Sequence, residues 1–181
     1  LRGELFQNLR REPEDPAIIP LLVSLLHDSS NLIQKCSLHY LVDLIHFDGV
    51  PNIITDFLRD TCESMKLSSS SSSKTSLRFF EIVCEAYKNK KNPIFQTILI
   101  PFADFLINHI LQSEILPHIG LTILSYIIPI ALKETINKID LDKLVMHIEQ
   151  SLVPHSSKRR LDSTFDLLLA CLKKTDLRFT I

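Results

Sequence analysis

The sequence predicts an all-α protein that forms a single domain. Apolar residues recur along most of the chain at the i, i+3/i+4, i+7 spacing of an amphipathic helix. Glycine occurs only three times in 181 residues, although about 7% is usual. Both the tight turns of a many-stranded sheet and Gly-rich phosphate loops need repeated glycines at positive φ, so these structures are excluded. No segment has a convincing strand pattern, since even the β-prone run Ile98–Ile100 lies inside a longer helical pattern.

The first two main helices are predicted over 16–27 and 30–47. Asp15 is placed to cap the first of them. Gly49 ends the second, because glycine readily takes the left-handed conformation that follows many helices. Pro51 opens a third helix, since a proline at the first helical turn loses no hydrogen bond.

Six consecutive serines, Ser68–Ser73, form a low-complexity stretch that cannot bury apolar surface. We expect a flexible Ser-rich loop over 67–74, with phosphorylation of the serines as an alternative role. Asn92 is expected to cap a later helix, and Pro101, Pro117 and Pro129 to bend helices or mark their first turns. The remaining helices are predicted near 3–11 and over 75–89, 93–112, 113–132, 140–153 and 157–174. Their short connections make successive helices antiparallel neighbours.

One part of the chain carries a family resemblance. Ala17–Asp28 is an apolar helix with a turn, Leu32–Leu44 is a second helix with the small residue Cys36 inside it, and Gly49–Ile54 begins a similar unit. Residues 17–58 thereby resemble the armadillo/HEAT family of α-solenoid repeats. The 31 residues from Pro20 to Pro51 are fewer than the roughly 40 of a full armadillo unit. The unit is therefore more similar to the simple helix pair of HEAT repeats.

The resemblance implies a right-handed α-solenoid of about four antiparallel helix pairs over residues 1–181. A repeat of this kind cannot bury its apolar face alone, so neighbouring repeats stack. Proteins of this family most often bind other proteins along the surface that results. We therefore expect a non-enzymatic interaction scaffold or a subunit of a larger complex, binding a partner helix or an extended segment on one face.

Charge and cysteine content favour an intracellular protein, cytoplasmic or nuclear. Twenty basic and 21 acidic residues give a formal charge of −1, which excludes a strongly basic arm, an acidic tail and wholesale disorder. Four cysteines without a C-x-x-C motif are expected to be structural thiols in a reducing compartment. The chain starts without a signal peptide and without an initiator Met, so we expect it to be part of a longer protein.

The chain contains no recognisable catalytic or nucleotide-binding motif. His39, Asp43 and His46 lie at spacings that place them on one helix face, where two imidazoles and a carboxylate could hold Zn²⁺ or Fe²⁺. A solvated helix face is the favoured interpretation of this triplet. We predict no catalytic residue, no metal site, no cofactor and no enzymatic activity.

Alternate helices of a solenoid share a surface, which assigns 30–47, 75–89, 113–132 and 157–174 to one side. In the second of these helices, charges of alternating sign recur at helical spacing from Lys74 to Lys88 and predict an exposed face. The residues expected to bind a partner are Lys35, His39, His46, Arg78, Glu85 and Lys88.

Two alternatives stay open. Basic inter-helix turns favour a nucleic-acid-associated or chromatin-associated subunit, with Lys90, Lys91, Lys158, Arg159 and Arg160 as contacts. A membrane anchor through 94–132 is favoured by 18 positions without formal charge from Ile115 to Leu132. Asp104 opposes insertion, because a carboxylate in mid-span costs about 2.5–3.5 kcal/mol. A buried helix pair is therefore preferred for this region.

Overall fold

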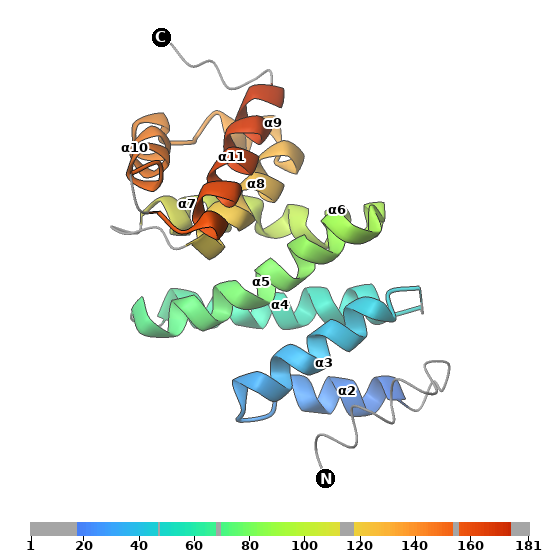
Figure 1. The fold of residues 1–181 in the computed structure, drawn as a ribbon. Coiled ribbons are helices and arrows are strands. Elements are labelled where there is room, and N and C mark those ends of the chain that lie inside the picture. Colours follow the sequence, from blue (N-terminus) through green and yellow to red (C-terminus); the bar gives the residue numbers. More distant parts are fainter. Residues whose placement is uncertain (1–17, 47, 68–69, 113–117, 154–155, 175–181) are drawn as a thin grey trace. The chain divides into compact units, whose positions relative to one another are not determined.

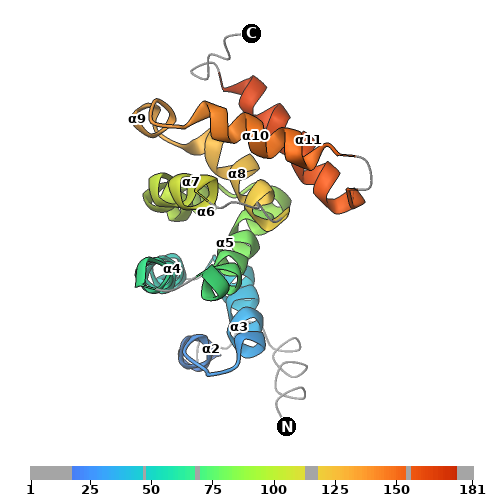
Figure 2. The same cartoon turned by 90° about the vertical axis from the view of Figure 1, so that its left-hand side faces the viewer.

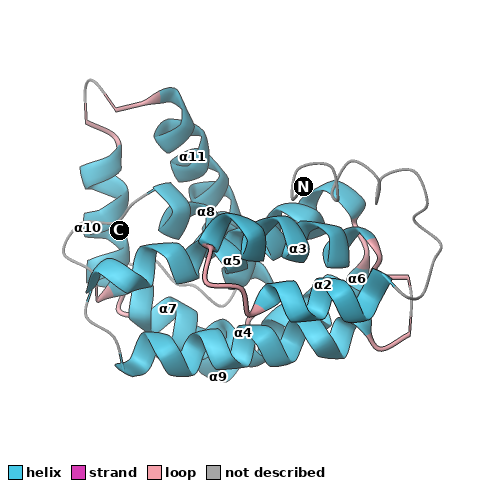
Figure 3. Cartoon of the chain, turned by 90° about the horizontal axis from the view of Figure 1, so that it is seen from below, coloured by secondary structure: helices cyan, strands magenta, loops and turns pink. Residues whose placement is uncertain are grey.

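The protein is all-α, as the sequence predicts. The computed structural model describes residues 18–46, 48–67, 70–112, 118–153 and 156–174 (Figure 1). In this part of the chain the helices are joined by short loops and there is no strand (Figure 3). The elements are α2 (Ile18–Leu26), α3 (Asn31–Asp43), α4 (Val50–Leu67), α5 (Ser70–Lys90), α6 (Pro93–Leu99), the 3-10 turn η1 (Ile100–Phe102), α7 (Ala103–Leu111), α8 (His118–Ile130), α9 (Lys133–Ile136), α10 (Leu141–Ser151) and α11 (Lys158–Lys173).

The cap predicted for one later helix agrees with the structure. The Asn92 side chain accepts a hydrogen bond of 3.1 Å from the Ile94 amide at the start of α6. The Ser157 side chain, which was not predicted as a cap, accepts a hydrogen bond from the Arg160 amide at the start of α11. The basic run that begins at Lys158 therefore lies in the first helical turn. The helix predicted near 3–11, its neighbour Asp15 and the start of the helix predicted at 113 lie outside the described residues.

Three segments differ from the predicted boundaries. The helix predicted over 93–112 is divided by η1 at Pro101, because a proline has no N–H to continue the ladder of hydrogen bonds. The predicted loop over 67–74 is much shorter, since α4 ends at Leu67 and α5 begins at Ser70. Serine is only moderately unfavourable in helices, so the strongly periodic segment that follows can extend the helix toward its N-terminus. The sequence missed α9, and α3 ends at Asp43 rather than near 47.

The residues group into two compact units, 1–61 and 62–181, where the sequence predicts one domain. Helix α4 contributes residues to both. In the first unit α2 packs on α3, and the Asp28 carboxylate accepts from the Ser30 amide at 2.8 Å in the turn between them. The next connection contains Gly49, whose φ of +84° is the left-handed conformation predicted for it. The core of this unit is formed mainly by Leu22, Leu26, Leu38, Leu41, Ile54 and Leu58.

In the second unit α8 is the central helix. It packs against α5 on one side and α11 on the other, and also contacts α7 (Figure 2). Nine of its 13 residues are buried, which is why this segment is apolar over most of its circumference.

Pro93–Leu111 is the one helical stretch, among the described residues, long and apolar enough to cross a membrane by length and composition. It has 19 residues and a mean hydropathy of 1.6. Half of its most apolar window is buried within the protein, as in many core helices of soluble proteins.

The four cysteines are free thiols in different surroundings. Burial raises the pKa of the Cys62 thiol to about 12 and that of Cys171 to about 11. Burial also raises the pKa of Cys84, which has no exposed surface, far above its ordinary value. Only Cys36 is partly exposed.

Alkylation of the native protein with iodoacetamide should therefore modify Cys36 first. Because the thiolate is the reactive form, the other three thiols should react at least about tenfold more slowly. Peptide mass mapping over time measures this order. All four should react at similar rates in denaturant, and modification of Cys84 as fast as Cys36 in the native protein would contradict the packing described here.

Candidate functional site

Helices α5, α8 and α11 run in the same general direction in the second unit. Arg159 of α11 bonds to Glu81 of α5 at 3.3 Å, and seven positions further along both helices Lys88 pairs with Asp166 at 3.2 Å. Residue numbers thus rise in the same direction on α5 and α11.

Contacts between α8 and α11 show the same direction. The hydroxyls of Thr122 and Ser163 lie 2.9 Å apart, and further along Lys174 donates to the Pro129 carbonyl oxygen at 3.1 Å.

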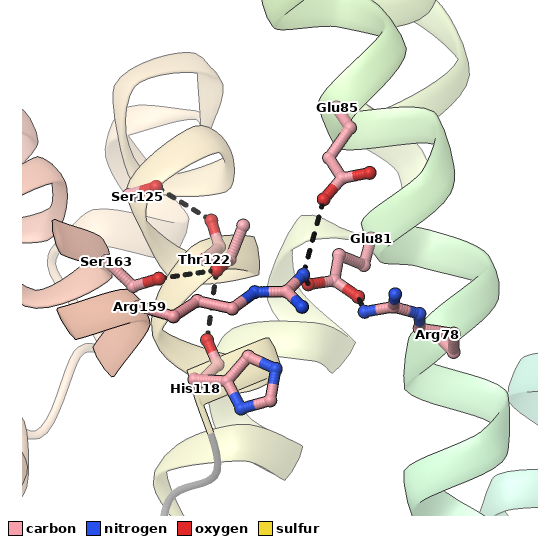
Figure 4. Close-up of polar contacts among 8 residues, drawn as sticks. All are labelled: Arg78, Glu81, Glu85, His118, Thr122, Ser125, Arg159 and Ser163. Atoms are coloured by element: carbon pink, nitrogen blue, oxygen red, sulfur yellow. Dashed lines mark hydrogen bonds and ion pairs between the residues drawn. The ribbon is translucent and has the colours of Figure 1, made fainter. Parts of the chain in front are cut away.

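Each of these helices contributes one row of polar side chains to a common surface (Figure 4). The residues of a row are spaced i, i+4, i+7 or i, i+4, which keeps them on one side of a helix. We call this surface the three-helix face. It consists of Glu81, Glu85 and Lys88 of α5, Thr122 and Tyr126 of α8, and Arg159, Ser163 and Asp166 of α11.

Glu81 is the buried centre of this face, with a side chain only 1% exposed. Its two carboxylate oxygens are paired with different arginines, Arg78 one turn earlier on α5 and Arg159 on α11. Arg159 also lies 3.7 Å from Glu85, so its guanidinium bridges two carboxylates (Figure 4). A buried charge needs partners of this kind, because its lost hydration is otherwise not replaced.

The arginines do not fully offset the cost of burying the carboxylate. Burial raises the pKa of Glu81 above its ordinary value, the charges of Arg78 and Arg159 lower it, and the nearby Glu85 raises it. The direction of the net shift is upward, because lost hydration is the largest effect. The ionised form of Glu81 is therefore less favourable in the folded protein than in water.

The N-terminus of α11 is basic, which opposes the helix dipole. Two of its three cations are used within the protein. Arg159 is held by Glu81 and Glu85, and Arg160 donates two hydrogen bonds of 3.2 Å to the Ser151 hydroxyl at the end of α10. These contacts compensate for the unfavourable position of the charges at the helix N-terminus, and they attach α11 to α5 and α10.

Lys88 completes the face at its other end. Its ammonium lies 5.9 Å from the centre of the Tyr126 ring, and hydrogen bonds to Tyr126 and Asp166 raise its pKa. Lys88 and Asp166 are each about half exposed, so this end of the face meets solvent.

The exposed stripe predicted from Lys74 to Lys88 needs correction. Glu81 is buried beneath Arg78 and Arg159, and Glu85 and Lys88 pair with residues of α11. The pattern of alternating charges is thus a contact between helices as much as a solvent face. The side chain of Lys74 is not among those described.

The residues expected to bind a partner fall into two groups. Arg78, Glu85 and Lys88 lie in the second unit, on or beside the three-helix face, and each is paired with a different residue. The other three, Lys35, His39 and His46, belong to the first unit, on α3 and in the turn that follows it. Each group is described only within its own unit.

The predicted nucleic-acid contacts do not converge. Lys90 and Lys91 are exposed at the end of α5. Arg159, in the first turn of α11, pairs with Glu81 of α5. Glu81 lies nine residues before Lys90, which is about 14 Å along the helix. With Arg159 and Arg160 held internally, Lys158 is the one cation of that turn with no contact among the described residues.

No group of three or more His, Cys, Asp or Glu side chains is placed to hold a metal ion within the described ranges. His39 and His46 are both exposed on the first unit. The buried His147 lies elsewhere, on α10, with its Nε2 3.3 Å from the Leu111 carbonyl oxygen.

Sequence reasoning missed the α8 and α11 residues of the three-helix face other than Arg159. The polar row at positions 159, 163 and 166 has the same i, i+4, i+7 spacing as the row on α5, and this was the available signal. Comparisons with models of protein families, with curated proteins and with solved structures find no match for this chain.

A double-mutant cycle at Glu81 and Arg159 tests the buried ion pair. We expect Arg159→Ala to lower the free energy of unfolding by about 1–2 kcal/mol, because it removes one partner of a buried carboxylate. The half-exposed guanidinium keeps this loss modest. In a Glu81→Gln background the same substitution should cost less than half as much. Chemical denaturation of the four proteins measures this coupling, with Lys158→Ala as the matched control, and equal costs in both backgrounds would show that the pair is not coupled.

The raised pKa of Glu81 predicts a pH effect of definite sign. The folded protein binds a proton at Glu81 more readily than the unfolded chain, whose carboxyl titrates near 4.5. This residue therefore destabilises the fold fully above its folded pKa, and stability is regained as pH falls through that pKa toward 4.5. Relative to Glu81→Gln, the wild-type protein should become more stable as pH falls from 7 to about 4.5. Unfolding both proteins across this range measures the difference, and a difference that does not change with pH would contradict the assignment.

Proposed function

We propose that the protein is a non-enzymatic interaction scaffold that binds a partner helix or an extended segment on the three-helix face. We also propose that its helix pairs form a right-handed α-solenoid of the HEAT/armadillo type, with about four pairs. The observation that carries both proposals is that α5, α8 and α11 run in the same general direction. Equivalent helices of successive repeats run parallel in such solenoids, and their exposed rows together form one long surface.

The chemistry of the three-helix face suits a protein partner. It combines part-exposed charges of both signs with Tyr126 and Arg159, and tyrosine and arginine are enriched where protein interfaces gain most of their energy. Ion pairs already hold these side chains in place, so binding costs less conformational entropy than it does for free side chains. A partner that carries both acidic and basic groups fits this surface.

The two alternatives receive less support. Nucleic-acid binding needs several converging free cations, and two of the five predicted contacts are held in internal bonds. Membrane anchoring needs α8 to be exposed to lipid, but α5 and α11 cover it. The free thiols fit an intracellular location, cytoplasmic or nuclear, within a larger complex.

A charge swap tests the proposed face while it keeps an ion pair between α5 and α11 and gives up only the Lys88–Tyr126 contact. Lys88→Asp with Asp166→Lys exchanges the two charges, so that an ion pair remains while the surface presents the opposite polarity. Asp56 and Arg59 form an equally exposed pair, 2.5 Å apart, on the first-unit part of α4. Asp56→Arg with Arg59→Asp is therefore the matched control.

We expect a protein captured from cell lysate by the wild-type chain to be retained by the control swap and lost with the α5–α11 swap. Quantitative mass spectrometry measures the captured proteins, and circular dichroism checks that both swapped proteins fold. Equal capture by both swapped proteins would remove the three-helix face from the proposal. Captured material that nuclease treatment releases would favour the nucleic-acid alternative.

A further inference from the structure

A second surface of α11 is apolar and exposed. Phe165, Leu169 and Leu172 are 58%, 50% and 76% exposed, and their i, i+4, i+7 spacing aligns them as one row. We call these three residues the α11 apolar row. At 3.6 residues per turn they lie about 140–160° around the helix from Leu167. Leu167 is fully buried, on the side of α11 that packs on α8.

The position of α11 in the stack explains why this row is open. Helix α8 is covered by α5 on one side and by α11 on the other. Helix α11 packs mainly against α8 and also contacts α10, and these contacts leave the α11 apolar row at least half exposed. Three large apolar side chains in this position are typical of a surface that another helix covers.

Charges beside the row identify the occupant. Asp162 and Lys173 are exposed, and neither has an ion-pair partner within the described residues. They are 11 positions apart, three helical turns, so they flank the same side of the row at its two ends. If two α11 helices pack antiparallel, Asp162 of each copy meets Lys173 of the other. In a parallel pair, Asp162 of one copy and Lys173 of the other would lie three turns apart, so neither ion pair could form.

We propose that α11 forms a two-fold symmetric, antiparallel contact with α11 of a second copy of this chain. The α11 apolar row lies at the centre of this contact, and two equivalent Asp162–Lys173 ion pairs flank it. A single self-complementary surface is what a two-fold dimer requires. The midpoint between Asp162 and Lys173 falls within about one residue of the centre of the α11 apolar row. A single two-fold axis can therefore relate both the apolar contact and the two ion pairs.

The test is the oligomeric state of the full 181-residue chain, measured by sedimentation equilibrium at micromolar concentrations. We expect the wild-type protein to be dimeric and Leu169→Glu to be monomeric. Leu132→Glu is the matched control, because Leu132 is 58% exposed but lies outside the row, and this protein should stay dimeric. Circular dichroism and thermal unfolding check that each variant is folded.

Substitutions at Asp162 and Lys173 give a second test, which leaves the α11 apolar row unchanged. Asp162→Lys alone or Lys173→Asp alone places like charges opposite each other at both ends, and should raise the dimer Kd by at least about tenfold. The double swap, Asp162→Lys with Lys173→Asp, should restore the wild-type Kd. Failure of the double swap to restore dimerisation would overturn the antiparallel arrangement.

Two other results would overturn the proposal. A wild-type protein that is monomeric at all concentrations excludes the second copy as the occupant. If deletion of residues 175–181 then produces a dimer, that segment of the chain covers the row instead, and if the deletion has no effect, the row serves a different protein. A dimer that Leu169→Glu leaves intact places the contact elsewhere.

Discussion

The arrangement of the second unit depends on the burial of α8 between α5 and α11. Helix α8 supplies apolar surface to both neighbours, and an isolated helix of 13 residues is marginal in water without such packing. Helices α5 and α11 both pack on α8, and the Arg159–Glu81 and Lys88–Asp166 ion pairs join them. These ion pairs require both helices to run in the same direction, and they bring the two polar rows together.

The buried carboxylate of Glu81 restricts how the helices can pack. Its ionised form is disfavoured in the fold, so its contribution to stability is small or unfavourable. Its contribution to the choice of helix register is larger. A shift of α11 by one turn against α5 would move Arg159 away from Glu81 and leave a buried charge with one partner fewer. The carboxylate therefore penalises incorrect registers more strongly than it stabilises the correct one.

The helices could be predicted from local patterns, because apolar periodicity and end signals such as Asn92 and Ser157 act within one turn of the chain. Which charged side chains are buried, and what they pair with, could not be predicted from local patterns. An alternating row such as Arg78, Glu81 and Glu85 is normally solvated, and whether Glu81 is buried depends on Arg159, 78 positions away. The exposed row on α11 was hidden for a similar reason. Leu167, Leu168 and Leu169 are consecutive leucines, and only the packing on α8 separates the buried Leu167 from the half-exposed Leu169.

The balance of charge on the three-helix face has a kinetic consequence. With Arg78 beside the face counted, three basic groups, on Arg78, Lys88 and Arg159, match three acidic groups, on Glu81, Glu85 and Asp166. Every one of these groups is paired. Such a surface has almost no long-range field to draw a charged partner toward it. Association would then proceed at the unsteered rate of about 10⁵–10⁶ M⁻¹s⁻¹, nearly independent of ionic strength. Selectivity on this face would come from how long a partner stays rather than from how often it arrives.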